Sequence, residues 1–205
     1  MVEIEVVSGA AMRPWLSDAA RLRIQVFREF PYLYDGNADY EARYLDTFAS
    51  ALDSTLILAL DRGEVVGCAT AMAMRGADIE FRRPFEDINA RLDEICYFGE
   101  SVLDIRYRGQ GIGHQFFDAR EAHARRCQAR LTTFCAVQRP ADHPLRPPAY
   151  RPLDAFWKKR GYQRRDDLTA RFGWKDIDQP TMSEKTMIFW TRKLTKQPEM
   201  SRNSF

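Results

Sequence analysis

Cysteine and histidine are both scarce in this chain of 205 residues, which holds four cysteines and three histidines. The cysteines include no pair spaced as Cys-x-x-Cys, so neither a zinc knuckle nor a thioredoxin-type redox site is indicated. They are Cys68, Cys96, Cys127 and Cys135. With no disulfide framework, the sequence predicts a reducing, cytoplasmic location.

Signals for a metal, a membrane and a nucleic acid are missing as well. The histidines form no His-Glu-x-x-His motif, and His114 and His123 lie too far apart on one expected helix to share an ion. No run approaches the roughly 20 apolar residues of a membrane span, and no secretory signal opens the chain. The 31 basic and 29 acidic residues leave a net charge of +2, too little to draw the chain to nucleic acid. We therefore expect no metal, no membrane and no nucleic-acid partner.

Hydrophobic residues make up 45% of the chain and charged residues 29%, which is the balance of a globular protein. We expect a single domain over residues 1–195 and a flexible tail over 196–205, where no apolar period is found. Glu alternates with β-branched residues over 2–7, which predicts a first strand, and further strands are predicted at 55–60, 64–74, 94–103, 131–137, 168–174 and 185–194.

Helices are predicted where apolar residues recur every three or four positions. One carries Trp15, Ala19, Leu22 and Val26 on its apolar face, and others are expected at 40–48, after Gly111 and at 152–160. Residues 75–93 resemble an insertion with about one helical turn, and the prolines of 138–153 indicate a stiff loop. The order predicts an α/β fold with a mixed sheet.

A glycine-rich turn joins one expected strand to the helix that follows it. Its residues are Arg108, Gly109, Gln110, Gly111, Ile112 and Gly113. Unshielded backbone N–H groups at the positive end of a helix suit an anion such as a pyrophosphate. A Rossmann fingerprint would need a glycine where His114 stands, and the chain has no Gly-Lys pair for a P-loop. A turn that binds nothing would explain the same glycines.

The stretch ESVLDIRYRGQGIGHQFF resembles the acyl-CoA-binding motif of the GNAT superfamily of N-acetyltransferases. Arg108, Gly111 and Gly113 fill its core pattern Gln/Arg-x-x-Gly-x-Gly/Ala, and Leu103 and Tyr107 agree with its flanks. Residues 156–162, FWKKRGY, resemble a later helix end of that family, and 187–190, MIFW, resemble its last strand. The resemblance covers residues 2–194.

The resemblance implies a mostly antiparallel central sheet with one splayed parallel pair and helices on both faces. It also implies that acetyl-CoA is a co-substrate, without a metal. The backbone amides of the glycine turn would hold its pyrophosphate, and the strands ending at Leu103 and Val137 would part to admit the pantetheine arm. The cofactor-binding residues implied are Val102, Leu103, Arg108, Gly109, Gln110, Gly111, Ile112, Gly113 and Trp157.

The reaction implied is transfer of an acetyl group to the primary amine of a small molecule, by direct attack in a ternary complex. Glu100 lies eight residues before Arg108, where many family members carry an acidic residue that faces the amine. A bulge at Gly99 would turn Glu100 toward the cleft, where it could act as the base. An ordinary strand glutamate that faces solvent is the alternative.

Two departures from the family pattern affect the leaving group and the acceptor. Trp157 stands where many members have the tyrosine thought to protonate the thiolate, so either Tyr150 or Tyr162 replaces it or no acid is needed. The Asn usually found after the strand ending at Val137 is missing, and Gln138 and Arg139 stand there. A silent acyl-CoA-binding domain of the same fold is the alternative function.

The acceptor pocket is expected between an aromatic, acidic segment at 30–36 and a basic, proline-rich segment at 139–151. Tyr32, Tyr34 and Arg139 are the substrate-binding candidates. Aromatic rings near carboxylates favour an amine, and arginines favour an acidic group on the same molecule, although solvation explains the arginines equally well. A homodimer is one state of assembly that the sequence allows.

Overall fold

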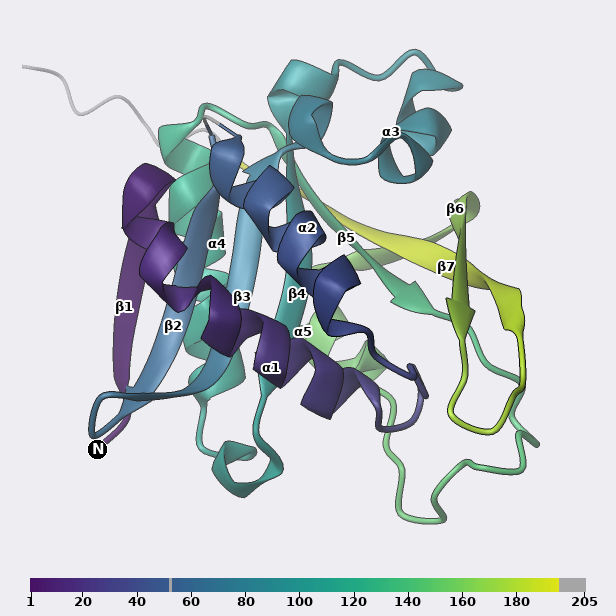
Figure 1. Cartoon of the computed structure of the whole chain (residues 1–205). Coiled ribbons are helices and arrows are strands. Elements are labelled where there is room, and N and C mark those ends of the chain that lie inside the picture. The colour runs from purple at the N-terminus through teal and green to yellow at the C-terminus, as the bar shows by residue number, and fades with distance from the viewer. Residues whose placement is uncertain (52, 196–205) are drawn as a thin grey trace, which may run out of the picture.

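The computed structural model describes residues 1–51 and 53–195, and their strands form one sheet in the order β1-β2-β3-β4-β5-β7-β6 (Figure 1). The strands are β1 (Glu3–Ser8), β2 (Thr55–Asp61), β3 (Glu64–Ala73), β4 (Ile95–Leu103), β5 (Leu131–Val137), β6 (Gln163–Lys175) and β7 (Met182–Lys193). Only β4 and β5 run parallel, and every other neighbouring pair in these ranges is antiparallel.

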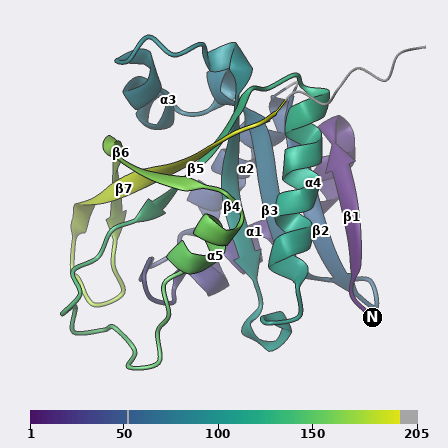
Figure 2. The same cartoon turned by 180° about the vertical axis from the view of Figure 1, so that it is seen from behind.

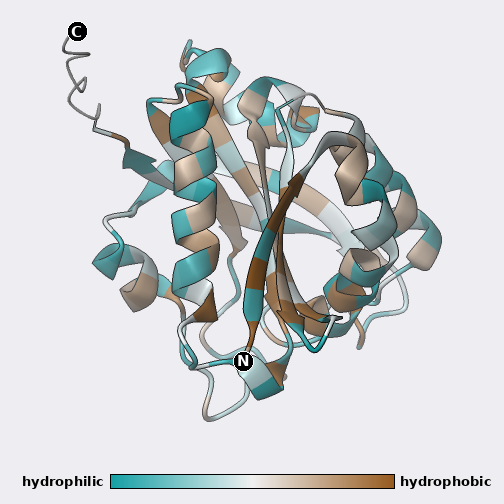
Figure 3. Ribbon diagram, turned by 90° about the vertical axis from the view of Figure 1, so that its left-hand side faces the viewer, coloured by the Kyte–Doolittle hydropathy of each residue, from teal (hydrophilic) through white to brown (hydrophobic). Residues whose placement is uncertain are grey.

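Helices cover both faces of the sheet. They are α1 (Leu16–Phe27), α2 (Ala38–Ser50), α3 (Ile79–Glu86), α4 (Ile112–Arg126) and α5 (Asp154–Lys159). Figure 1 shows α1 and α2 in front of the sheet, and Figure 2 shows α4 and α5 on the opposite face. Figure 3 views the molecule from the β1 edge, with helices on either side of the strands. The predicted α/β fold with a mixed sheet is confirmed.

The core is divided by the sheet because successive strand residues point to opposite faces. Leu56 and Leu58 of β2 pack with Leu22 of α1 on one face. Ile57 and Ala59, the residues between and after them, pack on the other face with Phe116 of α4. This alternation explains why the all-apolar strand β2 can be buried on both sides.

The parallel pair separates soon after it begins. β4 and β5 are in register only from Ile95 to Tyr97, opposite residues 131–133. Beyond Thr133, β5 keeps its pairing with β7 as far as Val137 while β4 stays with β3. Figure 2 shows β5 turning away from β4 toward β7. The sheet therefore has the splayed parallel pair that the sequence resemblance implies.

Three segments differ in extent from the sequence prediction. The insertion at 75–93 contains the eight-residue helix α3 despite Pro84, since its neighbour Phe85 is buried against the ring of Phe189, 5.0 Å away. β6 and β7 both begin earlier than predicted because they extend together as one long antiparallel hairpin. The loop 138–153 contains no helix or strand, as predicted. The predicted flexible tail, 196–205, lies outside the described residues.

All four cysteines are free thiols. Among the described residues, no helix is both long and apolar enough to span a membrane.

Candidate active site

A cavity of about 540 Å³ opens beside the splayed strands, on the face of the sheet that α1 and α2 cover. Nine of its lining residues are aromatic. The aromatic lining residues are Phe27, Tyr32, Tyr34, Tyr40, Tyr44, Phe81, Tyr97, Phe172 and Trp174. Its volume is in the range of sites that take a small molecule.

A β-bulge turns Glu100 into this cavity. Gly99 and Glu100 of β4 together face the single residue Thr70 of β3, so the pairing shifts by one residue there. Both Tyr97 and Glu100 then point to the cavity face, although strict alternation would send them to opposite faces. From the opposite face, Arg120 donates a 3.4 Å hydrogen bond to the Glu100 carbonyl oxygen. The predicted bulge at Gly99 is confirmed.

Arg23 of α1 joins two buried carboxylates at the floor of the cavity. Its guanidinium donates hydrogen bonds to Glu41 of α2 and to Glu100, and its Cζ atom lies 4.3 Å from the ring centroid of Tyr44. Tyr44 also donates a 3.3 Å hydrogen bond to Glu100. Burial by itself lowers the pKa of Arg23, but the negative charges of Glu100 and Glu41 outweigh it and hold the pKa well above its ordinary value. Arg23 is therefore a permanent cation.

One negative charge in this cluster has no protein partner. Arg23 uses the Oε2 atoms of both glutamates, while Oε1 of Glu41 and Oε1 of Glu100 are buried without a hydrogen bond to any described residue. The exposed fraction is 0% for Glu41 and 4% for Glu100. A buried carboxylate without a partner is costly, and a ligand cation would relieve that cost.

The glycine turn lies at the entrance to α4, where it presents free backbone N–H groups. Gly109 and Gly111 adopt φ values of 78° and 83°, which favour glycine. No described residue accepts a hydrogen bond from the backbone N–H groups of 109–113. The side chain of Arg108 is held in place by Glu29, at 2.7 and 3.1 Å, and by the carbonyl oxygen of Leu103. This arrangement fits a phosphate group.

The cavity also reaches the place where the parallel strands separate. Tyr97 of β4 and Cys135 of β5 face each other across the gap between these strands, with 3.8 Å between the hydroxyl oxygen and the sulfur, and both line the cavity. Val102 is buried and Leu103 is half-buried where β4 approaches the turn. Burial, more than the neighbouring Cys135, raises the pKa of Tyr97 well above its ordinary value.

Three aromatic residues named from the sequence do not line the cavity. Trp157 packs against Phe134 and Trp190 at ring distances of 5.0 and 5.1 Å. Tyr150 lies on the proline-rich loop with its ring 4.7 Å from that of Phe30. Tyr162 is 2% exposed in the core below α4.

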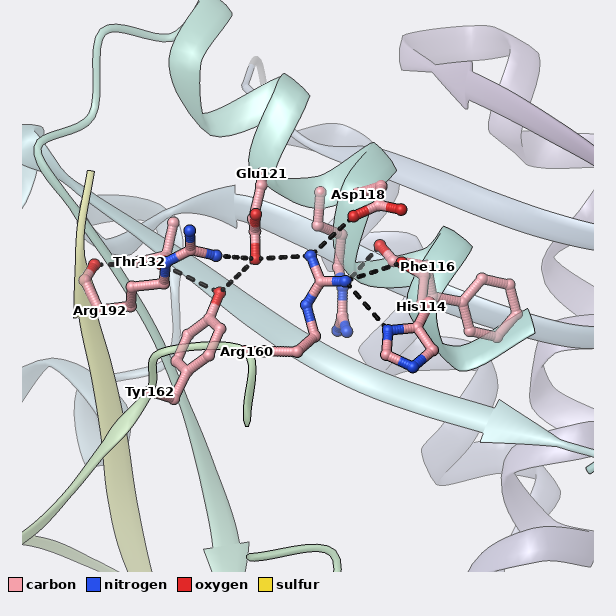
Figure 4. Close-up of polar contacts among 9 residues, drawn as sticks. His114, Phe116, Asp118, Glu121, Thr132, Arg160, Tyr162 and Arg192 are labelled. Atoms are coloured by element: carbon pink, nitrogen blue, oxygen red, sulfur yellow. Dashed lines mark hydrogen bonds and ion pairs between the residues drawn. The ribbon is translucent and has the colours of Figure 1, made fainter. Parts of the chain in front are cut away.

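The hydroxyl of Tyr162 belongs to a polar cluster centred on Glu121 (Figure 4). Oε1 of Glu121 accepts hydrogen bonds from Arg160 at 3.1 Å and from Arg192 at 2.8 Å. The Tyr162 hydroxyl lies 3.4 Å from the same atom and 3.1 Å from the Thr132 hydroxyl. These contacts fasten the end of α5 to α4 and β7.

Two of the three substrate-binding candidates lie at the cavity, and the third is held in an ion pair away from it. Tyr32 and Tyr34 line the cavity, but Arg139 does not. Arg139 donates to both carboxylate oxygens of Asp176 at 2.7 and 2.9 Å, and to the carbonyl oxygens of Pro31 and Tyr32. Its guanidinium therefore holds the loop after α1 in place through these hydrogen bonds.

Sequence reasoning missed Arg23, Glu41 and Tyr44. Arg23 did leave a signal, because it follows Ala19 by four residues and shares the apolar face of its helix. An arginine at such a position needs a buried partner. Glu41 left the same signal, because it precedes Leu45 by four residues and Phe48 by seven on the buried face of α2. Tyr44 left none, since an aromatic residue on a helix needs no charged partner.

The sequence was compared with protein families and with curated proteins. The model of the Acetyltransferase (GNAT) family matches residues 19–147, from within α1 to the proline-rich loop. The chain therefore belongs to the GNAT acetyltransferase family. No curated protein matches it.

Solved structures share this fold at low sequence identity. The protein yncA of Salmonella typhimurium, assigned as an acetyltransferase and solved with its cofactor acetyl-CoA, is 12% identical with a TM-score of 0.59, covering 98% of this chain and 99% of its own. A ribosomal-protein-alanine N-acetyltransferase from Brucella melitensis is 13% identical with a TM-score of 0.60, covering 94% and 99%. An aminoglycoside 6'-N-acetyltransferase in complex with coenzyme A is 13% identical with a TM-score of 0.59, covering 96% and 99%.

Proposed function

We propose that this chain is an N-acetyltransferase that moves an acetyl group from acetyl-CoA to the primary amine of a small molecule. The transfer takes place by direct attack in a ternary complex, with Glu100 as the base. The observation that supports this most strongly is the buried, unpartnered oxygen of Glu100 in an aromatic cavity beside the splayed strands. Such a carboxylate suits an ammonium group better than a hydroxyl or an anion.

The chain's own groups fit the co-substrate. The free N–H groups of 109–113 would hold the pyrophosphate, and the gap beyond Tyr97 would admit the pantetheine arm. Val102 and Leu103 lie where the thioester would meet the strand, and Trp157 would contribute only through packing. When bound, acetyl-CoA supplies the activated acetyl group.

Glu100 accepts the proton that the acceptor amine must lose before it can attack. An amine with a lysine-like pKa of about 10.4 arrives as an ammonium ion. Glu100 binds that ion and accepts one proton, which frees the nitrogen lone pair to attack the thioester carbonyl. As the C–N bond forms and the C–S bond breaks, the second nitrogen proton passes to the departing sulfur. Glu100 then releases its proton to solvent, and Arg23 keeps the carboxylate in position throughout.

Replacing Glu100 with Gln tests this role. General-base assistance contributes about 10²- to 10⁴-fold, so kcat should fall by that factor at neutral pH. The affinity for acetyl-CoA, measured by calorimetry, should not change. The loss should shrink at high pH, where more of the amine is already neutral.

The matched control is Glu94→Gln, because Glu94 lies just before the same strand and pairs with Arg91 and Arg130 outside the cavity. Near-wild-type kcat in the Glu100→Gln enzyme would contradict the role of Glu100. Binding of acetyl-CoA without release of free CoA with any amine in a broad panel would instead identify a silent acyl-CoA-binding domain.

A further inference from the structure

We infer that the acceptor is a primary amine with an aromatic, uncharged body and no carboxylate, and that its ammonium group contacts Glu41 as well as Glu100. This inference rests on the proposed function for the reaction that follows binding, but the binding itself is tested separately below.

The charges of the cavity floor favour a single cation. Two carboxylates share one guanidinium, which leaves one negative charge, and each carboxylate has a buried free oxygen. Since Arg23 uses one oxygen of each glutamate, it holds both side chains while the second oxygens remain for a ligand. One ammonium group, with its three N–H donors, would neutralise this cluster.

An acidic group on the same molecule would find no partner in this cavity. Among the described residues, the only other basic side chain in the lining is that of Lys175. Its ammonium lies 2.7 Å from Asp35, a carboxylate that also pairs with Arg28 at 3.1 Å. The arginines of the proline-rich loop, which the sequence suggested for a carboxylate, are absent from the lining, and Arg139 is bound to Asp176.

The walls above the floor are built from paired aromatic rings. Tyr40 and Tyr44 of α2 are stacked, with ring planes 13° apart. Phe81 of α3 packs against Tyr97 at 4.6 Å, and Tyr32 stacks on Trp174 with planes 27° apart. Rings held in pairs offer flat apolar surfaces to a second ring at little entropic cost. They would also attract a second cation. So would the carboxylate of Asp78, which lines the cavity without an ion-pair partner among the described residues. A diamine is therefore the competing ligand that the experiment must separate.

The test measures binding to the protein with CoA, which carries no acetyl group to transfer. Binding is measured by calorimetry, and the change in total tryptophan fluorescence, to which Trp174 contributes from the cavity wall, provides a second measurement. The ligands are 2-phenylethylamine, its neutral analogue 2-phenylethanol, phenylalanine, which adds a carboxylate, and 1,4-diaminobutane. We expect 2-phenylethylamine to bind at least about tenfold more tightly than each of the other three.

Equal binding of phenylalanine, phenylethanol or diaminobutane would overturn the inference, and so would the absence of binding by phenylethylamine. If phenylethylamine binds as expected but acetyl-CoA releases no CoA in its presence, the proposed function fails and the inference about the ligand class stands.

The part played by Glu41 is tested with Glu41→Gln. We expect its affinity for 2-phenylethylamine to fall at least about tenfold while its affinity for 2-phenylethanol is unchanged. Asp39→Asn is the control, because Asp39 lies on the same helix but is exposed and absent from the cavity lining. A folded Glu41→Gln protein with wild-type affinity for the amine would overturn the role of Glu41. If this variant does not fold, the comparison of amine and alcohol in the wild-type protein still decides the charge requirement.

Discussion

At the scale of single residues, the candidate site consists of buried polar side chains whose hydrogen-bonding groups the protein satisfies only in part. Glu100 and Glu41 are buried, and Arg23 donates a hydrogen bond to only one oxygen of each carboxylate. Tyr97 lies in the gap between β4 and β5 with a thiol as its hydrogen-bonding neighbour, which is a weak acceptor. Glu41, Tyr97 and Glu100 all line the same cavity.

The Tyr97 hydroxyl is placed to donate a hydrogen bond to a sulfur in the gap. Because burial raises its pKa, it stays protonated and can stabilise a departing thiolate without losing its own proton. We expect Tyr97→Phe to lower kcat by about tenfold or more, the typical value of a hydrogen bond to a charged group. The affinity for CoA should be preserved.

A spectroscopic titration separates this role from a packing defect. The thiol of bound CoA, followed by thiolate absorbance, should ionise below its ordinary pKa of about 8.5 in the wild type and closer to that value in Tyr97→Phe. Identical thiol titrations in the two proteins would show that the hydroxyl does not reach the sulfur.

The glycine turn is tested at Gly111, which has φ = 83° and nothing within 4 Å of an added Cβ. Gly111→Asp would place a negative charge among the free N–H groups. We expect at least a tenfold loss of acetyl-CoA affinity by calorimetry, or about 1.4 kcal/mol. Gly63→Asp is the control, since Gly63 has φ = 84°, is equally open and lies in the β2–β3 turn. Equal affinities in the two variants would refute the assignment of the turn.

At the scale of elements, the site depends on how closely β3, β4 and α4 approach one another. Gly67 of β3 lies opposite Leu103, where β4 leaves the sheet for the glycine turn. A Cβ at this position would lie 2.5 Å from Cδ1 of Leu103 and 3.2 Å from Cζ of Phe116. The absence of a side chain at Gly67 therefore allows α4 and the end of β4 to pack on the same strand.

We expect Gly67→Ala to destabilise the fold by about 1–3 kcal/mol, the usual cost of overpacking a core. Urea denaturation measures the change. Gly173→Ala is the matched strand control, because a Cβ there would lie 3.5 Å from Cε of the flexible Met182, an ordinary contact. A Gly67→Ala midpoint equal to that of Gly173→Ala would contradict the predicted clash.

At the scale of the whole molecule, Asp176 joins three distant parts of the chain. It binds Arg139 of the loop after β5, lies 3.2 Å from the Lys185 ammonium of β7, and pairs by backbone with Tyr34. Burial on its own raises the pKa of Asp176, but hydrogen bonds from Arg139 and Lys185 outweigh burial and hold the pKa below its ordinary value.

This shift predicts a loss of stability in acid. Because the pKa of Asp176 is lower in the folded than in the unfolded chain, its contribution is complete above the unfolded pKa of about 3.9 and is lost as the pH falls through the folded value. Urea midpoints of the wild type and Asp176→Asn should differ most near neutral pH and converge below about pH 4. A difference that stays constant down to about pH 3 would show that ionisation of Asp176 is not involved.

Several features could be predicted from the sequence because their causes are local. The strand at 55–60, the glycine-rich turn before α4 and the bulge at Gly99 depend on neighbouring residues, and the structure confirms each of them. The motif around Arg108 also indicated the family, since a loop that presents backbone N–H groups needs glycines at fixed spacing.

Only the tertiary structure decided which charged side chains form ion pairs with one another. Arg23 and Glu100 are 77 positions apart and Arg139 and Asp176 are 37 apart, so no local pattern could pair them. The sequence placed Arg139 at the acceptor and overlooked Glu41, because it shows that a residue is charged but not whether a partner already satisfies it. The positions of Trp157 and Tyr162 could not be predicted from local spacing either, because each ring packs against Phe134, which is distant in the sequence. Local spacing determined the strands, the helices and the glycine turn, whereas long-range packing determined which carboxylate oxygens remain without a partner in the cavity.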